Sequence, residues 1–482
     1  MDTTKKSSKK LVQAIVIIAL MLGFRLIPPI GPLTPVGMEV LGIFFGCIVG
    51  WACGEQIWPS FLAVIMLGMV DGTTVGGSFT AALGNTTVHM VLLCMLLCYE
   101  FQASGMIDYL TRFILSRKFA QKSPWMLLAA FWIAGAVSCG LTNGTVVIVI
   151  ILWNMFYNLV DTLKLEKDSP YVAIGIIGIA ITCYLGGNIM PYSSFTQICF
   201  GVAAAANPDV TVNYTSYIAL QAILTFALIP LLIAFCKYVL RVKIDYAVPD
   251  DLFGGGELKM DRKVKYTFIY IAILVVLLVV PFYLPKTLKI VQLINQLGLV
   301  GTFALILVCM ALTPDGEGGK LVNLSEAFSK GVPYGLICIV ATALTMAGQL
   351  TSEATGIPTM LTTMLAPITN IGSPYLILVI FVILGTILTN IINNIVCATI
   401  MIPVGMALVA TTGINPAVMI ALFCMVLQQG IVVPSGSVFG ALLHGIDGYI
   451  TSKSVYKYGV ALEIVIALFV GFIGTALANL LF

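Results

Sequence analysis

The chain has 482 residues, of which 60% are hydrophobic and 9% carry a charge, and its formal net charge is +3. Soluble domains carry about 25% charged residues, so this composition excludes a soluble globular protein and predicts an integral membrane protein. The small net charge gives no sign of a nucleic-acid partner. The 12 cysteines lack metal-ligand spacing, so we expect them to pack inside apolar helices.

The first half of the chain begins with a basic tail, MDTTKKSSKK, that predicts a cytoplasmic N-terminus. This tail and a first helix, expected over 11–30, form an N-terminal region, 1–35. A first repeat, 36–240, follows. Its expected segments are helices over 36–53, 57–71 and 87–104, an amphipathic interfacial stretch over 107–122, a hairpin over 124–160, a broken helix over 170–206 and a helix over 216–240.

Two segments of this repeat are too irregular for ordinary membrane spans. Residues 124–160 form two apolar arms that meet at a polar junction, which predicts a re-entrant hairpin. The segment 170–206 would reach ~55 Å as one straight helix, against about 30 Å for the hydrocarbon core. Because GGNIMPYSS interrupts this segment, we expect a helix that breaks near the middle of the membrane.

The second half of the chain follows a loop over 241–263, whose dense charge predicts a cytoplasmic linker. A second repeat then runs from 264 to 482. Its expected segments are helices over 264–284, 295–312 and 333–350, a stretch over 351–371 without Lys or Arg, a hairpin over 373–410, a broken helix over 413–446 and a last helix over 456–480. In this topology only Arg25, Lys286 and Lys289 of the 24 Lys and Arg residues lie at or near the outside, as the positive-inside rule requires.

The two halves of the chain resemble each other at their most unusual positions. Ser138, Thr142 and Asn143 match Thr389, Asn393 and Asn394 at a constant offset of 251. Gly187, Pro191 and Ser194 match Gly430, Pro434 and Ser437 at a constant offset of 243. The loops place the two hairpin entries on opposite sides of the membrane, so the repeat is inverted. Inverted repeats with broken helices are typical of secondary transporters, whose binding sites lie where the repeats meet.

The polar residues of the hairpins and breaks suit the binding of an anion and a cation together. The ends of half-helices offer free N–H groups to an anion, and backbone carbonyls with Ser, Thr and Asn oxygens offer neutral ligands to Na⁺. Polar residues also join helices to one another in membranes, but their match between two hairpins and two breaks favours a ligand site.

Lys, Arg, Asp and Glu are absent from the four site segments, and His444 is the one histidine there. A proton relay needs such a group within the membrane, so Na⁺ is the favoured coupling ion. Glu39, Glu100 and Glu463 are expected to anchor their helices at the interface. His444 either adds pH dependence or packs near the cytoplasmic mouth.

At these hairpins and breaks the sequence resembles the divalent anion/sodium symporter (DASS) family of the ion-transporter superfamily. That family carries Ser-Asn-Thr at each of two hairpin tips and Thr-Pro-Pro-like breaks in two helices. Both tips here keep the central Asn but replace the Thr, by Gly144 and by Ile395. The paired prolines are replaced by Phe195-Thr196 and Val438-Phe439. An apolar Ile395 suggests a pocket with fewer hydrogen bonds than that of a C4-dicarboxylate carrier.

The resemblance implies specific site residues. The first sodium site would use Ser138, Asn143 and Gly187, and the second Thr389, Asn394 and Gly430. The substrate would contact Thr142, Asn143, Gly144, Ser193, Ser194, Asn393, Asn394, Ile395, Gly436 and Ser437. The resemblance also implies an elevator motion and a homodimer.

Together these observations predict an all-α polytopic protein of the cell membrane with about 11 transmembrane helices, two re-entrant hairpins and two inverted repeats. The expected function is Na⁺-coupled symport of a small organic anion resembling a di- or tricarboxylate, with no cofactor besides Na⁺. A Na⁺-independent anion exchanger on the same fold is the alternative. A channel is less favoured, because an inverted repeat with two re-entrant hairpins indicates alternating access. A membrane-embedded enzyme is less favoured, because no cluster of catalytic residues lies in the spans.

Overall fold

The computed structural model describes residues 2–244, 260–315, 319–446 and 448–482. Most of the expected linker, residues 245–259, lies outside the described residues. The described residues form helices and contain no β-strand, only one isolated bridge between Pro314 and Lys320. The all-helical class is therefore confirmed.

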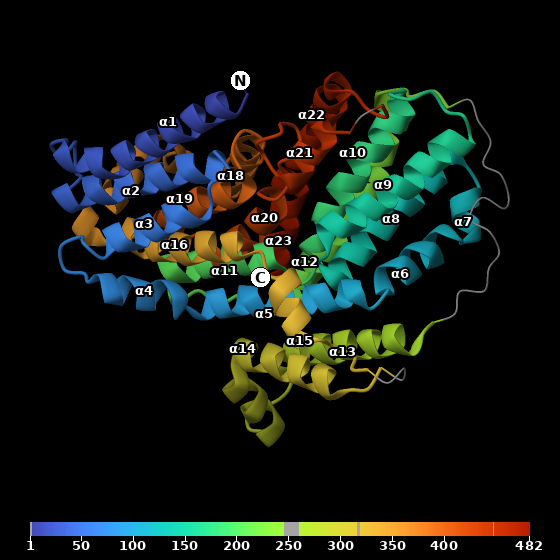
Figure 1. Cartoon of the computed structure of the whole chain (residues 1–482), viewed down its shortest axis with the longest axis horizontal. Helices are drawn as coiled ribbons and strands as arrows, with labels where there is room; N and C mark the ends of the chain where they lie inside the picture. Colours follow the sequence, from blue (N-terminus) through green and yellow to red (C-terminus); the bar gives the residue numbers. More distant parts are fainter. Residues whose placement is uncertain (1, 245–259, 316–318, 447) are drawn as a thin grey trace.

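The first half of the chain contains twelve α-helices, coloured blue to green in Figure 1. Their bounds are α1 Asp2–Gly23, α2 Pro35–Ala52, α3 Ile57–Leu67, α4 Val75–Leu83, α5 Thr86–Ala103, α6 Met106–Leu115, α7 Lys118–Gln121, α8 Pro124–Thr142, α9 Thr145–Thr162, α10 Pro170–Gly187, α11 Ser194–Ala206 and α12 Tyr214–Ala234. A π-helical turn, Phe235–Val239, continues α12.

The described part of the second half contains eleven α-helices, coloured yellow-green to red. Their bounds are α13 Arg262–Val279, α14 Lys289–Leu312, α15 Leu324–Glu326, α16 Tyr334–Leu350, α17 Ile357–Thr369, α18 Pro374–Thr389, α19 Asn394–Thr412, α20 Pro416–Val426, α21 Val438–His444, α22 Ser452–Leu468 and α23 Thr475–Leu481. A π-helical segment, Phe469–Gly474, joins α22 to α23.

Nine helices within the described residues are long and apolar enough to cross a membrane, or ten if the bent pair Leu324–Gly331 and Tyr334–Leu350 counts as one span. This number is slightly below the expected 11. The helix expected over 57–71 is too short on its own, because α3 has 11 residues, and the halves α11 and α20 of the broken helices have 13 and 11. The protein is a multi-pass membrane protein.

A cap residue followed by proline begins four of the helices that build the hairpins and breaks. Ser123 Oγ accepts a hydrogen bond from Met126 N at the start of α8, and Ser373 Oγ accepts one from Leu376 N at the start of α18. Ser169 caps α10 in the same way, and Asn415 caps α20 through Ala417 N. Proline has no N–H, so it fits the first turn, where that group would lack a partner.

Several elements differ from the sequence-based expectations. The first helix begins at Asp2 instead of residue 11. It ends at Gly23, before the expected residue 30, because Pro28 and Pro29 cannot continue a helix. Helix α4 was not expected. Helix α14 begins at Lys289, earlier than the predicted residue 295, and is interrupted at Gly298, where φ is 61° and ψ is −171°.

The helices of the hairpins and breaks share one hydrophobic core. The largest buried cluster draws mainly on α8 to α12 and α18 to α22, where Trp132, Phe156 and Phe423 are fully buried. A second cluster joins α13 and α14 to α5, and a third joins α1, α2 and α3 to α16. In Figure 1, α1 to α4 extend to one side of this central body and α13 and α14 project below it.

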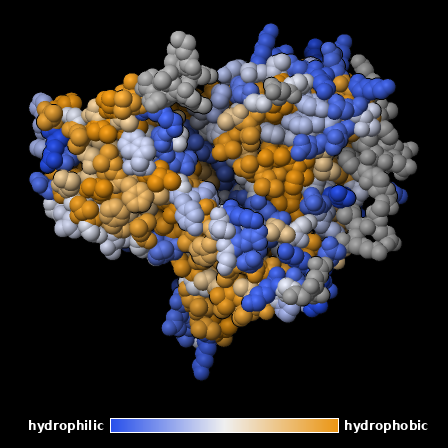
Figure 2. All heavy atoms as spheres, in the orientation of Figure 1, coloured by the Kyte–Doolittle hydropathy of each residue, from blue (hydrophilic) through white to orange (hydrophobic). Residues whose placement is uncertain are grey.

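Apolar side chains cover much of the outer surface. Figure 2 shows wide hydrophobic areas over the region of α1 to α4 and over the projecting region of α13 and α14. On α14, Leu305, Val308 and Leu312 are 45%, 48% and 72% exposed. Such surfaces fit contact with lipid tails, which are as apolar as leucine.

Candidate functional site

The first hairpin reverses direction at a two-residue tip. Helix α8 ends at Thr142, and Asn143 adopts the left-handed conformation with φ of 52°. The Thr142 hydroxyl donates to Ser138 O over 2.7 Å and accepts from Gly144 N over 3.3 Å, so this predicted substrate donor is engaged within the tip. A Cβ on Gly144 would lie 2.7 Å from Gln102 Nε2 of α5, which explains why glycine stands there.

The first tip contacts the first broken helix directly. Asn143 Nδ2 donates to Ser194 Oγ over 3.3 Å. A Cβ on Gly187 would lie 2.9 Å from Thr145 Cγ2 and 3.8 Å from Asn143 Oδ1, so the C-terminal end of α10 also lies against the tip. Ser138 is fully buried and its hydroxyl has no hydrogen-bond partner in the described structure. The structure thus brings Asn143, Gly187 and Ser194 together.

Two helix N-termini meet without side-chain caps at this contact. Helix α9 begins after Gly144, which has no side chain to cap it. Helix α11 begins after Ser193, whose buried hydroxyl accepts no hydrogen bond from the first turn and has no other partner within the described residues. Free N–H groups at a helix N-terminus carry a partial positive charge of about half a unit. The first tip and break therefore present two open positive helix ends.

The second tip and break are also joined, but their N-termini are capped. Asn394 N donates to Gly436 O over 2.9 Å. Asn393 Oδ1 accepts from Ile395 N at the start of α19, over 3.0 Å. Ser437 Oγ accepts from Gly440 N at the start of α21, over 3.1 Å. Most donors that an anion would need at this end are therefore already paired.

Backbone carbonyls converge at the second break. A Cβ on Gly430 would lie 2.4 Å from Thr389 O and 2.8 Å from Gly436 O. A Cβ on Gly436 would lie 2.9 Å from Gly430 O and 3.0 Å from Thr389 O. The Thr389 hydroxyl donates to Leu427 O. The predicted second set, Thr389, Asn394 and Gly430, is thus gathered around carbonyl oxygens, which are ligands that Na⁺ accepts.

Asn390 holds the second tip in place. Its Nδ2 donates to Thr386 O and its Oδ1 accepts from Val432 N, each over 2.9 Å. Both ends of this amide are therefore occupied, and it ties the hairpin to the break.

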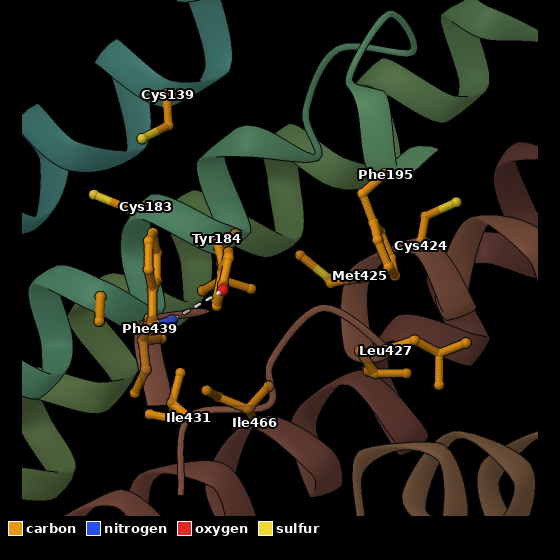
Figure 3. Packing of buried hydrophobic residues seen from close by; sticks show 14 of the residues in the cluster. Cys139, Cys183, Tyr184, Phe195, Cys424, Met425, Leu427, Ile431, Phe439 and Ile466 are labelled. Carbon is orange, nitrogen blue, oxygen red and sulfur yellow. Dashed lines mark hydrogen bonds between the residues drawn. The ribbon is translucent and has the colours of Figure 1, made fainter. Parts of the chain in front are cut away.

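The two broken helices pack against each other in the centre of the molecule. Tyr184 of α10 stacks on Phe439 of α21, with ring centroids 3.9 Å apart and planes 20° apart. Tyr184 OH also accepts from Phe439 N over 3.5 Å, the dashed line in Figure 3. Among the described hydrogen bonds none joins the first predicted residue set to the second. Helix packing links them instead, through this pair of rings and through α11, which packs against α19 and α20.

One ionisable residue contacts the second break, and another is buried in α22. His444 Nε2 lies 2.9 Å from Val432 O, and its ring centre is 4.9 Å from that of Tyr456. Glu463 is 5% exposed, and neither carboxyl oxygen has a partner in the described structure. The expected interfacial role of Glu463 stays a prediction, and the structure shows that its carboxyl group is buried within the helical span Ser452–Leu481.

Sequence reasoning also missed two buried amides at the breaks. Asn188 follows Gly187, and Gln429 precedes Gly430; both are fully buried, and both polar atoms of each side chain lack partners in the described structure. The repeat gave no signal for Asn188, because the matching position is Ile431. The described residues contain no group of three or more His, Cys, Asp or Glu side chains that would hold a metal ion.

Comparison with known proteins identifies similar transporters. A family model described as "Citrate transporter" (CitMHS) matches residues 56–427, well over half of the chain. No curated protein matches. Among solved structures, the YdaH transporter of Alcanivorax borkumensis, reported to have an unusual topology, aligns with a TM-score of 0.56 and 17% identity, over 92% of this chain and 97% of that chain. At this identity the structural match shows a shared fold.

Proposed function

Since the chain belongs to the citrate transporter (CitMHS) family, we propose that it carries a di- or tricarboxylate such as citrate across the cell membrane together with Na⁺. The family is related to the DASS family within the ion-transporter superfamily, so the resemblance seen in the sequence is confirmed. The chain is a secondary transporter of organic anions and not an enzyme.

The proposal rests mainly on one observation: the two breaks differ in the polar groups that they leave open. The first tip and break offer open N-termini of α9 and α11 beside the Asn143 to Ser194 hydrogen bond. The second offers the carbonyls of Thr389, Gly430 and Gly436, with its helix N-termini capped. Positive helix ends favour a carboxylate, and clustered carbonyls favour a cation. We assign anion binding mainly to the first break.

We assign two sodium sites to the residue sets at the tips. Ser138, Asn143 and Gly187 form the first, supported by the unpartnered buried Ser138 hydroxyl. Thr389, Asn394 and Gly430 form the second, supported by the converging carbonyls. Both sets consist of neutral oxygen ligands.

We expect anion binding to be coupled to Na⁺ binding, because the four site segments contain no Lys or Arg. A hydrogen bond to a charged group contributes only about 1.5–3 kcal/mol net, so neutral donors alone hold a multiply charged anion weakly. A bound Na⁺ adds positive charge and orders the tips. Anion and Na⁺ then raise each other's affinity by the same factor.

An elevator motion is the proposed transport mechanism. Most buried residues of the hairpins and broken helices share one hydrophobic core, and most of those of α1 to α3 and of α13 to α14 belong to two other clusters, with Val64 of α3 and Val396 of α19 as exceptions. This division supports a mobile body that carries both tips and a static body that includes the outer helices. We further propose a homodimer with the N-terminus in the cytoplasm.

Uptake of radiolabelled citrate into proteoliposomes tests the proposal. An inward Na⁺ gradient should drive accumulation, and replacement of Na⁺ by choline should abolish it. Equal uptake in both conditions that depends on anion inside the vesicles would establish the exchanger instead.

A further inference from the structure

A glutamine of α5 packs against the tip of the first hairpin. A Cβ built on Gly144 would lie 2.7 Å from Gln102 Nε2 and 2.8 Å and 2.9 Å from Gln102 Cγ and Cδ, so this side chain lies directly on the tip. Cys98, one helical turn earlier on the same face of α5, lies beside the Asn143 side chain. One face of α5 therefore meets both residues of the tip.

The amide of Gln102 has no protein partner. The residue is half-buried, and its side chain forms no hydrogen bond with any residue that the structure describes. A glutamine amide carries two N–H donors, so it can donate to a carboxylate without bringing a formal charge to the site. The four site segments contain no Lys or Arg, so an additional neutral donor has a place in anion binding.

The surroundings of this amide favour an anion. Gly144 stands immediately before α9, so Gln102 Nε2 lies close to the open N-terminus of that helix. The bond from Asn143 to Ser194 brings the uncapped start of α11 to the same tip. Ser193 at that start is 1% exposed, and its hydroxyl has no partner in the described structure. Amide and hydroxyl donors beside two positive helix ends suit a carboxylate.

The one acidic residue of α5 lies on another face of the helix. Glu100 stands two positions before Gln102, and residues at this spacing do not face each other. The carboxylate of Glu100 is contacted by the backbone of Asn323, in the segment that leads into α15. The face of α5 that meets the tip therefore presents no negative side chain of this helix to an anion.

Gln102 comes from a different packing unit than the tips and breaks. The larger share of the buried residues of α5, Phe101 among them, belongs to the cluster of α13 and α14. In the proposed elevator motion the tips move with the central body, while α5 stays with α13 and α14. Gln102 then reaches the anion in the arrangement of this structure and separates from it when the body moves.

We propose that the Gln102 amide donates a hydrogen bond to a carboxylate of the transported anion at the first tip. Gln102 is then a specificity-determining residue that lies outside both hairpins and both breaks. This inference rests on the proposed anion site at the first break and extends that site to α5.

The test combines calorimetric titration of citrate at high Na⁺ with thermal unfolding of the purified full chain, with and without citrate. Gln102→Met removes the amide at similar volume. Gln102→Glu keeps the shape of the side chain but replaces its N–H donors by a carboxylate oxygen. Gln56→Met is the matched control, because the Gln56 side chain lies against Gly335 in a similar way, at the start of α16 and outside the site segments.

We expect Gln102→Met to raise the citrate Kd roughly 10-fold, as for the loss of one hydrogen bond to a charged group, and Gln102→Glu to raise it further. The Tm of Gln102→Met without citrate should match that of the wild type, because no protein hydrogen bond is lost. The increase in Tm caused by citrate should shrink. The citrate affinity of Gln56→Met should equal that of the wild type.

Two results would overturn this inference alone. The first is an equal citrate Kd in the wild type and in both Gln102 variants. The second is a lower Tm without citrate together with the same rise in Kd in both variants, which would show that Gln102 only packs against Gly144. A wild type that does not bind citrate at high Na⁺ would instead overturn the proposed function.

Discussion

Asn143 Nδ2 donates to Ser194 Oγ over 3.3 Å, and this bond joins the tip of the first hairpin to the start of the second half of the first broken helix. The two residues lie 51 positions apart in the chain, yet their contact brings two uncapped helix N-termini to one place. The anion site that we propose is built around this contact.

Removal of the Asn143 amide should weaken citrate transport. Asn143→Gly keeps the left-handed turn, whereas Asn143→Ala adds backbone strain of roughly 1–2 kcal/mol. Loss of about 1.5–3 kcal/mol of binding free energy should raise the citrate KM of Asn143→Gly roughly 10-fold to 100-fold. The Na⁺ concentration for half activation should also rise. Uptake kinetics that match the wild type in Asn143→Gly would refute the assignment.

Serine substitutions at the two breaks should have different effects. Ser193→Ala removes a hydroxyl without a protein partner, so the Tm without anion should hardly change while citrate affinity falls. Ser437→Ala removes a helix cap, so stability should fall by about 1 kcal/mol. Thermal unfolding with and without citrate separates the two cases, and identical behaviour of both variants would argue against the asymmetry.

A methyl group at Gly430 should disturb the carbonyl cluster. In Gly430→Ala the added Cβ would lie 2.4 Å from Thr389 O, so the carbonyls must move apart. We expect Na⁺ activation of uptake to be lost and the Tm to fall. Gly348→Ala in α16 is the control, because nothing lies within 4 Å of its added Cβ. Normal Na⁺ activation in Gly430→Ala would show that these carbonyls do not bind the ion.

The loops after the first hairpin and the second broken helix are joined by Asp168. Its carboxylate accepts from Thr451 N and Thr451 Oγ1, each over 2.9 Å. Burial raises the pKa of Asp168, but hydrogen bonds from Thr451 and Ser454 outweigh it, so the pKa lies below its usual value. A lowered pKa stabilises the fold above the unfolded-state pKa of about 3.9, and the effect disappears as the pH falls through the folded-state pKa.

Asp168→Asn should therefore destabilise the protein in a pH-dependent way. Asparagine tolerates the left-handed conformation of this residue, with φ of 59°, so the change mainly removes the charge. We expect a Tm lower by about 2–4 °C at neutral pH and a smaller difference below about pH 4. Asp71→Asn, at an exposed position, is the control. A Tm difference that stays constant across this pH range would contradict the explanation.

The repeats made the hairpins and breaks predictable from the sequence. The Ser-Pro pairs at 123–124 and 373–374 mark helix starts in any context, and the matched Asn and Gly residues marked the tips and breaks. The residues that were missed carry no such signal. Gln102 lies in a helix outside the matched segments. In a chain that is 60% hydrophobic, lipid-facing and core-facing positions are equally apolar, so the sequence does not distinguish them. Burial of Glu463 and Asn188 was therefore visible only in the structure.

Calorimetric titration of citrate into the purified protein tests Na⁺-coupled anion binding most directly. The titration is carried out at low and at high Na⁺, with choline holding ionic strength constant. We predict that citrate binds at least 5-fold more tightly at high Na⁺, within the usual range of coupling between two sites. Equal affinities in the two conditions would contradict Na⁺-coupled symport.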